Sequence, residues 1–225
     1  MENIVKKFKI TRVSVVMLLF AFLWNQGVYY LGQIISRNRI HMDFTMAFDK
    51  ETPFVPWTIV IYFGCFIFWA AVYYYIATNA KERAYEFFLA DFIGKLICFI
   101  FFVFLPTTNI RPLVVGNDIW SIMVNFLYRI DSPSNLFPSI HCMVSWLCWA
   151  GLRNKKECHF AFKAVSFLMA ISVCISTLTT KQHVIIDVAG AVLISEAAIF
   201  VSRSKRLIKI YKEAINRLSN LILIM

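Results

Sequence analysis

Long apolar runs, separated by short polar segments, make up most of the chain. There are six of these runs, and most are close to the ~20 residues that an α-helix needs to cross a bilayer core. The runs are Val13 to Ile35, Val55 to Ala77, Phe87 to Pro106, Pro138 to Leu152, Phe160 to Thr180 and Val184 to Val201. The fourth run is short, and it crosses only if its first turn lies inside the membrane boundary. The pattern predicts an all-α fold, a polytopic membrane bundle of about six transmembrane helices, in one domain over residues 1–225.

Two segments outside these runs carry apolar residues on one side only. Ile119 to Ile130 is amphipathic, which predicts a helix lying along the membrane interface. Residues 203–225 combine basic residues with apolar residues at helical spacing. The apolar positions are Leu207, Tyr211, Ala214, Leu218 and Leu221. This pattern predicts an amphipathic tail helix that lies on anionic lipid at the cytoplasmic face.

Composition supports the membrane interpretation. The chain is 60% hydrophobic and 16% charged, with a mean hydropathy of +0.67, whereas an average soluble domain is about half apolar and about a quarter charged. The basic start followed by an apolar run resembles a signal peptide. That run is too long, however, and Phe22 to Asn25 offers no small-residue cleavage site. The six cysteines form no Cys-x-x-Cys pair, so we expect small buried side chains rather than disulfides or a zinc site.

The net charge of +10 comes mainly from loops on one side of the predicted membrane. If the N-terminus is cytoplasmic, 16 cations face the cytoplasm and six face the other side, as the positive-inside rule requires. The cytoplasmic cations are Lys6, Lys7, Lys9, Arg12, Lys81, Arg83, Arg153, Lys155, Lys156, Lys163, Arg203, Lys205, Arg206, Lys209, Lys212 and Arg217. We therefore expect a multi-pass protein of a bacterial plasma membrane with both termini cytoplasmic. Its basic residues would meet anionic lipid rather than nucleic acid.

Polar residues cluster at the extracytoplasmic ends of three predicted helices. They are Arg111 after the third run, Ser139 and His141 at the start of the fourth, and Lys181, His183 and Asp187 at the start of the sixth. Ionisable groups at such depth are costly to bury, so they are candidates for function. We expect these residues to share one site.

The chemistry of this set favours phosphoryl transfer. His183 and Asp187 are four positions apart on the predicted helix, so the carboxylate can accept the Nδ1–H and leave Nε2 with a free lone pair. His141 lies at a helix start, which favours an anion, and Arg111 and Lys181 add cations. Two histidines with these cations indicate a phosphohistidine intermediate better than a metal site. Since no cluster of three or more Asp, Glu, His or Cys is available at this face, we expect metal-independent chemistry without a cofactor.

In order and spacing, these residues resemble the type-2 phosphatidic acid phosphatase superfamily. The resemblance covers roughly residues 85–200 and rests on Arg111-Pro112, Pro138-Ser139-x-His141 and His183-x-x-x-Asp187. It implies a six-helix membrane fold that hydrolyses or transfers phosphate from a lipid phosphate or pyrophosphate without metal. It also implies the following roles: His183 as nucleophile, Asp187 as its partner, His141 as the acid for the leaving group, and Arg111 and Ser139 as phosphate ligands.

The sequence departs from the family pattern at three positions. The lysine that normally precedes Arg111 by seven residues is replaced by Phe104, and the arginine six residues before His183 is replaced by Thr177. Ile140 stands where the family has glycine. Two phosphate-binding cations are therefore missing, and Lys181 is the candidate substitute.

Several functions are compatible with this pattern. A lipid phosphatase is the leading hypothesis. The Phe-Pro-Ser-x-His motif looks more like that of the inositol phosphorylceramide synthase branch, whose members transfer a phospho-headgroup between lipids. The missing cations suggest a catalytically inactive relative. Asp91 and Lys95 within the third run, with Asn25, Gln26 and Gln33 in the first, suggest a transporter or channel. For Asp91 and Lys95 we expect instead an internal ion pair near the cytoplasmic end.

Overall fold

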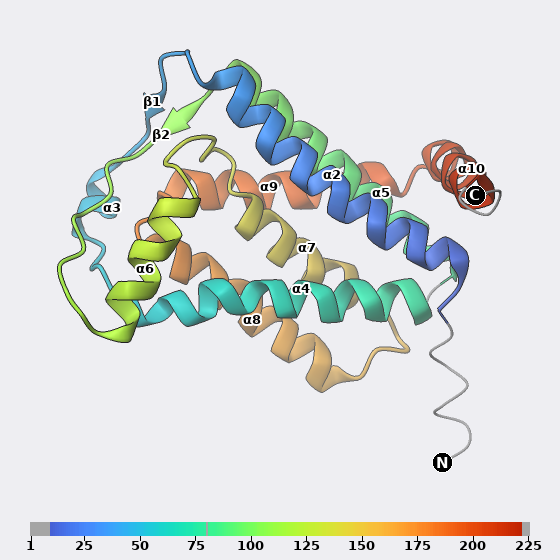
Figure 1. The fold of residues 1–225 in the computed structure, drawn as a ribbon. Coiled ribbons are helices and arrows are strands. Elements are labelled where there is room, and N and C mark those ends of the chain that lie inside the picture. Colours follow the sequence, from blue (N-terminus) through green and yellow to red (C-terminus); the bar gives the residue numbers. More distant parts are fainter. Residues whose placement is uncertain (1–9, 80, 222–225) are drawn as a thin grey trace.

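The protein is an all-α membrane bundle, as the pattern of apolar runs predicted (Figure 1). The computed structural model describes residues 10–79 and 81–221. The helices are α2 (Arg12–Ser36), α3 (Ala47–Glu51), η1 (Pro56–Thr58), α4 (Ile59–Asn79), α5 (Lys81–Phe104), α6 (Ile119–Ile130), α7 (Ile140–Arg153), α8 (Phe160–Thr179), α9 (Ile185–Ser202) and α10 (Lys205–Leu221). One short parallel pairing joins β1 (Met42–Asp43) to β2 (Thr107–Thr108).

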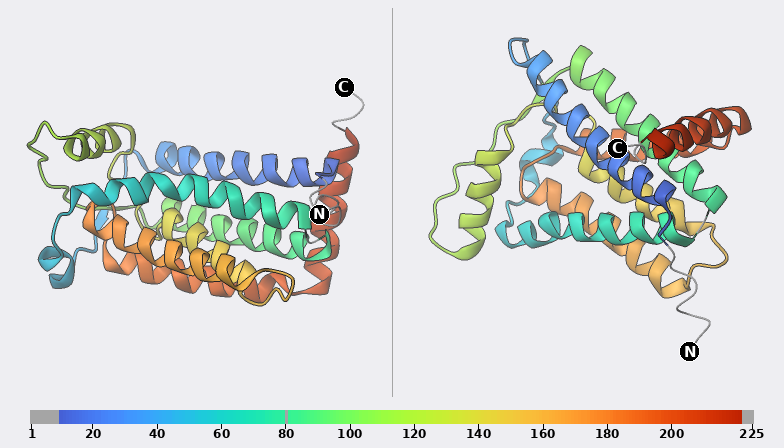
Figure 2. Two further views of the ribbon diagram at one scale, coloured as in Figure 1. Left: turned by 90° about the horizontal axis from the view of Figure 1, so that it is seen from below. Right: turned by 45° about the vertical axis from the view of Figure 1, so that its right-hand side comes forward.

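Five helices in the described part of the chain are long and apolar enough to cross a membrane: α2, α4 with η1, α5, α8 and α9. They run side by side along the long dimension of the molecule (Figure 2). Their outward surfaces carry large apolar side chains, such as Ile67 at 77% exposure and Leu193 at 70%. Such exposure suits contact with lipid chains rather than water.

The predicted fourth span forms α7, which differs from the other five. Its 14 residues extend roughly 21 Å at ~1.5 Å per residue, less than the ~30 Å of a bilayer core. It packs against α8 and α9 and also contacts α4 and α5. Because its neighbours surround it, α7 needs little lipid contact, which is why its apolar run is short. Its N-terminus carries Ser139 and His141 into the interior of the bundle.

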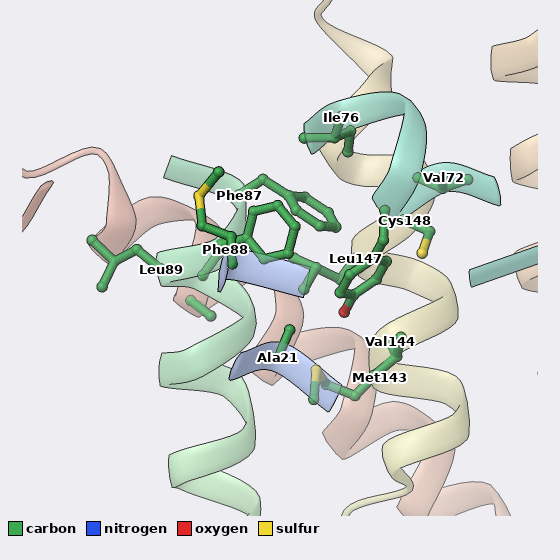
Figure 3. Packing of buried hydrophobic residues seen from close by; sticks show 14 of the residues in the cluster. Ala21, Val72, Ile76, Phe87, Phe88, Leu89, Met143, Val144, Leu147 and Cys148 are labelled. Atoms are coloured by element: carbon green, nitrogen blue, oxygen red, sulfur yellow. The ribbon is translucent and has the colours of Figure 1, made fainter. Parts of the chain in front are cut away.

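The apolar core lies where α2, α4, α5 and α7 meet (Figure 3). Phe87 and Phe88 of α5 pack near Ile76 of α4 and Leu147 of α7. All six cysteines are buried and unpaired, so the expectation of small buried side chains is confirmed.

The two ends of the bundle differ in structure. At one end, segments 37–58, 105–139 and 180–184 join the helices and include α3, α6 and the β1–β2 pairing (Figure 1). We call this the loop end. At the other end α2, α5 and α8 begin and α4, α7 and α9 end, and α10 crosses it. We call this the basic end, because the predicted cytoplasmic cations lie there or on α10, except that Lys6, Lys7 and Lys9 fall outside the described residues.

Both predicted amphipathic segments are helical. The α6 helix matches the predicted bounds and buries Val124 and Leu127 against the start of α4. The tail helix α10 buries Tyr211 and Ile215 against α2 and α5. Part of its apolar side therefore contacts protein, and residues 222–225 lie outside the described part. That either helix lies on lipid stays a prediction.

An ion pair is buried among the helices between α2 and α5. Lys95 Nζ lies 2.9 Å from the Asp91 carboxylate, and both side chains are almost fully buried. The Tyr73 hydroxyl donates to Asp91 at 2.5 Å, and Lys95 Nζ donates to the Ala21 carbonyl at 3.2 Å. The expected internal ion pair is confirmed, but it lies near the middle of α5 rather than near one end.

Candidate functional site

His183 and Asp187 meet at the start of α9. His183 Nδ1 lies 3.1 Å from Asp187 Oδ2, and the same oxygen accepts the Val184 amide at 3.1 Å. The prediction that both residues lie on one helix is wrong in detail, because α9 begins at Ile185 and Val184 is its N-cap. An aspartate in the third helical position accepts from the N-cap amide, as in a capping box. Asp187 therefore caps the helix and orients the preceding imidazole at once.

Three backbone contacts fix the segment that carries His183. The amides of Gln182 and His183 both donate to the Thr177 carbonyl, at 2.9 and 3.1 Å, which closes a tight turn at the end of α8. Lys181 takes the left-handed conformation in this turn, with φ of 54°. Asp49 of α3 accepts the Ile185 amide at 2.7 Å, so the α3 loop is docked on the start of α9.

The Asp187 carboxylate controls the charge of His183. Burial on its own lowers the pKa of His183, but the hydrogen bond to Asp187 and the charge of Asp187 outweigh it, and the net pKa lies above the ordinary 6.5. The carboxylate fixes Nδ1 as the donor, so Nε2 of the neutral ring carries the lone pair. The second carboxylate oxygen of Asp187 is buried without a partner among the described residues.

His141 lies beside His183, with their ring centroids 6.1 Å apart. Rings of α4 surround it, with centroids at 4.5 Å for Tyr62, 5.9 Å for Phe66 and 5.6 Å for Trp69. Its Nδ1 lies 3.4 Å from the Tyr62 hydroxyl. Unlike His183, His141 contacts no carboxylate in the described structure, so a positive charge on its ring would have to be compensated by a bound anion.

Ser139 links the two helix starts. As N-cap of α7, its hydroxyl accepts the Cys142 amide at 3.2 Å, and its own amide donates to the Asp187 carbonyl at 3.3 Å. This contact brings the beginnings of α7 and α9 together, and with them the two histidines. The Ser139 side chain is fully buried and does not line the spaces at the histidines, so in this structure it caps α7 and does not face a bound phosphate.

Arg111 is held close to, but outside, the space between the histidines. One of its terminal nitrogens donates to the side-chain oxygen of Gln182 at 2.6 Å, and the other donates to the Asp131 carbonyl. Its guanidinium lies over the Tyr128 ring, 4.9 Å from the centroid. Arg111 therefore anchors the residue before His183 in this structure, and its buried Nε has no partner among the described residues.

The Lys181 ammonium group points away from the histidines into the α3 loop. It donates to the carbonyls of Asp49 at 2.6 Å and of Thr52 at 2.5 Å. To bind phosphate it would have to leave these acceptors. Phe104, at the family's lysine position, is 75% exposed on the outer side of α5, and the buried Thr177 hydroxyl contacts the Cys142 sulfur at 3.4 Å. At both positions, the cation that the resemblance would imply is replaced by an uncharged side chain.

Three spaces that share lining residues lie at or next to the histidines. A cavity of ≈ 60 Å³ is bordered by both imidazoles, Asn25, Phe66 and Trp69 among others. A groove of ≈ 370 Å³ between α2 and α4 shares Asn25, Phe66 and Trp69 with it and is otherwise lined mainly by apolar side chains. At the loop end, a hollow of ≈ 800 Å³ is lined by Asp49, Lys181 and His183, among others. His183 thus borders both the inner cavity and the outer hollow.

The site includes residues that the sequence analysis missed. The Asp131 carboxylate lines the inner cavity and accepts the Tyr29 hydroxyl at 2.5 Å. Tyr62 contacts His141, and Gln182 holds Arg111. Asp131 follows an amphipathic helix directly, at the start of Asp-Ser-Pro-Ser. An acidic residue seven positions before Pro138 could have marked Asp131 as part of the site. No feature of the sequence marked Tyr62 or Gln182.

Within the described residues, no group of three or more His, Cys, Asp and Glu lies close enough together to hold a metal ion. Comparison of the chain with protein-family models, with curated proteins and with solved structures found no match.

Proposed function

We propose that the protein is a lipid phosphatase that works through a phosphohistidine on His183. One observation carries the proposal. An imidazole oriented by a buried carboxylate borders both the outer hollow and a cavity that shares its walls with an apolar groove among the helices. A lipid phosphate needs both environments, since its chain belongs in the apolar groove and its phosphate must be reached by water.

The reaction takes two steps at phosphorus. His183 Nε2 attacks, the bond from phosphorus to the leaving oxygen breaks, and His141 gives that oxygen a proton. Water then attacks the phosphohistidine while His141 takes back a proton, which releases inorganic phosphate and frees Nε2. Before the first step, the negative phosphate compensates the charge on His141, which has no carboxylate partner in the described structure.

The groove supports a substrate with a long apolar part. Its walls include Leu18, Phe22 and Val144, while Lys95 on the same wall is already bonded to Asp91 and Ala21. The shared residues Asn25, Phe66 and Trp69 lie where the groove meets the cavity of the histidines. An acyl or prenyl chain in the groove would bring its phosphate to His141 and His183.

Headgroup transfer is the second candidate, and Asp131 favours it. A carboxylate in the cavity repels a phosphate dianion but accepts a hydrogen bond from an alcohol. For such a transfer the donor is a phosphodiester lipid: His183 displaces its diacylglycerol and keeps the phospho-headgroup. An acceptor alcohol that replaces water in the second step then takes the headgroup, and a new phosphodiester forms.

The test is an assay of the purified protein in detergent with phosphatidic acid, a prenyl pyrophosphate and phosphatidylinositol, each with and without a ceramide acceptor. Release of inorganic phosphate that persists in EDTA and disappears in His183→Ala supports the phosphatase. Acceptor-dependent product without free phosphate assigns the transferase. Activity that is lost in EDTA and restored by one divalent ion contradicts the mechanism.

The side of the membrane can be tested separately. Asn117 is exposed at the loop end, and all six native cysteines are buried. Asn117→Cys should therefore react with an impermeant maleimide in intact cells if the histidines face outward. Labelling only after permeabilisation would place the site on the cytoplasmic side.

A further inference from the structure

A small hollow at the basic end contains a buried ammonium group that has no counter-ion among the described residues. The hollow, of ≈ 240 Å³, lies between α5, α7 and α9. Lys155, two residues after α7, lines it and is 7% exposed, and its Nζ has no hydrogen-bond partner among the described residues. Buried polar groups are nearly always bonded, and a buried charge is costly unless an opposite charge or strong acceptor accompanies it.

The other charged residues of the hollow leave this charge uncompensated. Arg83, Glu86 and Arg203 line the hollow together with Lys155, which gives three cations and one carboxylate. Arg83 lies 3.5 Å from Glu157 and Arg203 lies 3.8 Å from Glu86, whereas the Lys155 ammonium group has no such carboxylate among the described residues. Burial, and after it the charge of Arg83, lower the pKa of Lys155 to about 8, although Cys158, Glu157 and Glu86 act in the opposite direction. An anion in the hollow would stabilise all three cations.

The position and walls of the hollow indicate what the anion is attached to. It lies where α7 and α9 end and α5 begins, which is headgroup depth for a bundle whose helices cross the bilayer. Phe87, Ala90 and Ile199 form apolar walls. The Phe87 ring packs so closely on Gly151 that a Cβ there would lie 2.6 Å from it, so glycine is needed at this wall.

We propose that this hollow binds the phosphate of an anionic lipid headgroup, with Lys155, Arg83 and Arg203 as its ligands. Guanidinium and ammonium groups bind phosphate through charge-assisted hydrogen bonds, and basic pockets between membrane helices bind such headgroups. The bound lipid would join α5, α7 and α9 at the basic end. The inference is independent of the chemistry of the histidines at the loop end.

Thermal unfolding of the full chain in detergent tests the proposal. The melting temperature is followed during titration with phosphatidylglycerol, phosphatidylcholine or inorganic phosphate. The variants are Lys155→Gln and Lys156→Gln, which remove the same charge from adjacent residues, buried and exposed respectively. Phosphatidylglycerol should stabilise the native chain and Lys156→Gln alike, with at least about fivefold weaker apparent affinity for Lys155→Gln. Arg203→Gln, on an exposed side chain that is safe for folding, should weaken the response as well.

Each arm of the titration decides one part of the proposal. Stabilisation by phosphatidylglycerol alone, weakened in Lys155→Gln and Arg203→Gln, supports a headgroup site. Equal protection by inorganic phosphate, lost in the same variants, supports the anion site but overturns the lipid source. Identical responses of the native chain, Lys155→Gln and Arg203→Gln overturn the site.

Discussion

Two buried acid–base pairs lie in this bundle, and they differ in what surrounds them. Asp91 and Lys95 are saturated: Lys95 also lines the apolar groove, but the Tyr73 hydroxyl donates to Asp91 and the Ala21 carbonyl accepts from Lys95. His183 and Asp187 have a similar spacing and similar burial, yet His183 borders two open spaces and Asp187 Oδ1 has no partner in the described structure. Burial and spacing alone therefore do not distinguish a structural pair from a reactive one. The difference is whether the hydrogen-bonding capacity is saturated.

The first and largest expected effect is that of His183→Ala. Activity should fall by about 10⁴-fold or more, because the attacking atom is gone. The melting temperature should change little, since Asp187 still caps the Val184 amide. Kinetics with phosphatidic acid and a thermal melt in the same detergent measure both. A variant that keeps its activity removes His183 as the nucleophile, and with it the phosphohistidine mechanism.

Asp187→Asn should lower the rate by roughly 10⁴-fold, because the amide no longer holds the proton of His183 on Nδ1 and Nε2 loses its free lone pair. It should also move the pH profile. With Asp187 present, the pKa of His183 lies above 6.5, and attack requires the neutral ring, so kcat/KM should rise with pH through a limb above 6.5. Without the carboxylate, burial is opposed less strongly, so that pKa falls and the limb should shift to lower pH. An unmoved limb would show that another group titrates.

Substitutions in the saturated pair, Asp91 and Lys95, should change the free energy of unfolding rather than the rate. Asp91→Ala leaves Lys95 buried without its partner, which should cost about 3–5 kcal/mol of unfolding free energy. The double variant Asp91→Leu with Lys95→Met should recover most of that loss, and where folded it should keep near-native kcat. Denaturation in mixed micelles and an activity assay give the two numbers. Loss of turnover in a well-folded double variant would make this pair part of the function, as in the transporter alternative.

His141→Ala should have the most selective and smallest effect. General acid catalysis contributes ~10²–10⁴-fold when the leaving group is a poor one, such as the alkoxide of a lipid. Nitrophenyl phosphate has a good leaving group, so its rate should be partly spared. The comparison is the ratio of the two losses in one folded variant. Equal losses on both substrates would remove the general-acid role.

The bundle could be predicted from the sequence because membrane-crossing helices need long apolar runs. Such runs are visible in the sequence itself, without knowledge of tertiary contacts. The sequence also predicted the meeting of His183 and Asp187, because a contact across four residues is local. The α7 helix was harder to recognise, since a helix that other helices surround needs no long lipid-facing run. Its 14 residues therefore gave a weak membrane signal.

The rest of the site depends on contacts between distant parts of the chain. Lys181 satisfied the charge pattern expected of a phosphate ligand, but its ammonium group reaches carbonyls in the α3 loop about 130 residues earlier. Arg111 is bonded to Gln182 across 71 residues, and Asp49 accepts from the first amide of α9 across 136. No local pattern encodes such contacts, because they depend on how the loop end is folded.

The most direct test of the reactive pair is to isolate the phosphorylated enzyme. The native protein and His183→Ala are mixed with phosphatidic acid that carries a radiolabelled phosphate, quenched in alkali, digested and analysed by mass spectrometry. Phosphohistidine survives alkali and is lost in acid, unlike a phosphoserine. The account predicts alkali-stable label on the imidazole of His183 and none in His183→Ala. Turnover of the lipid without such label in the quenched native protein, or label on another residue, would contradict it.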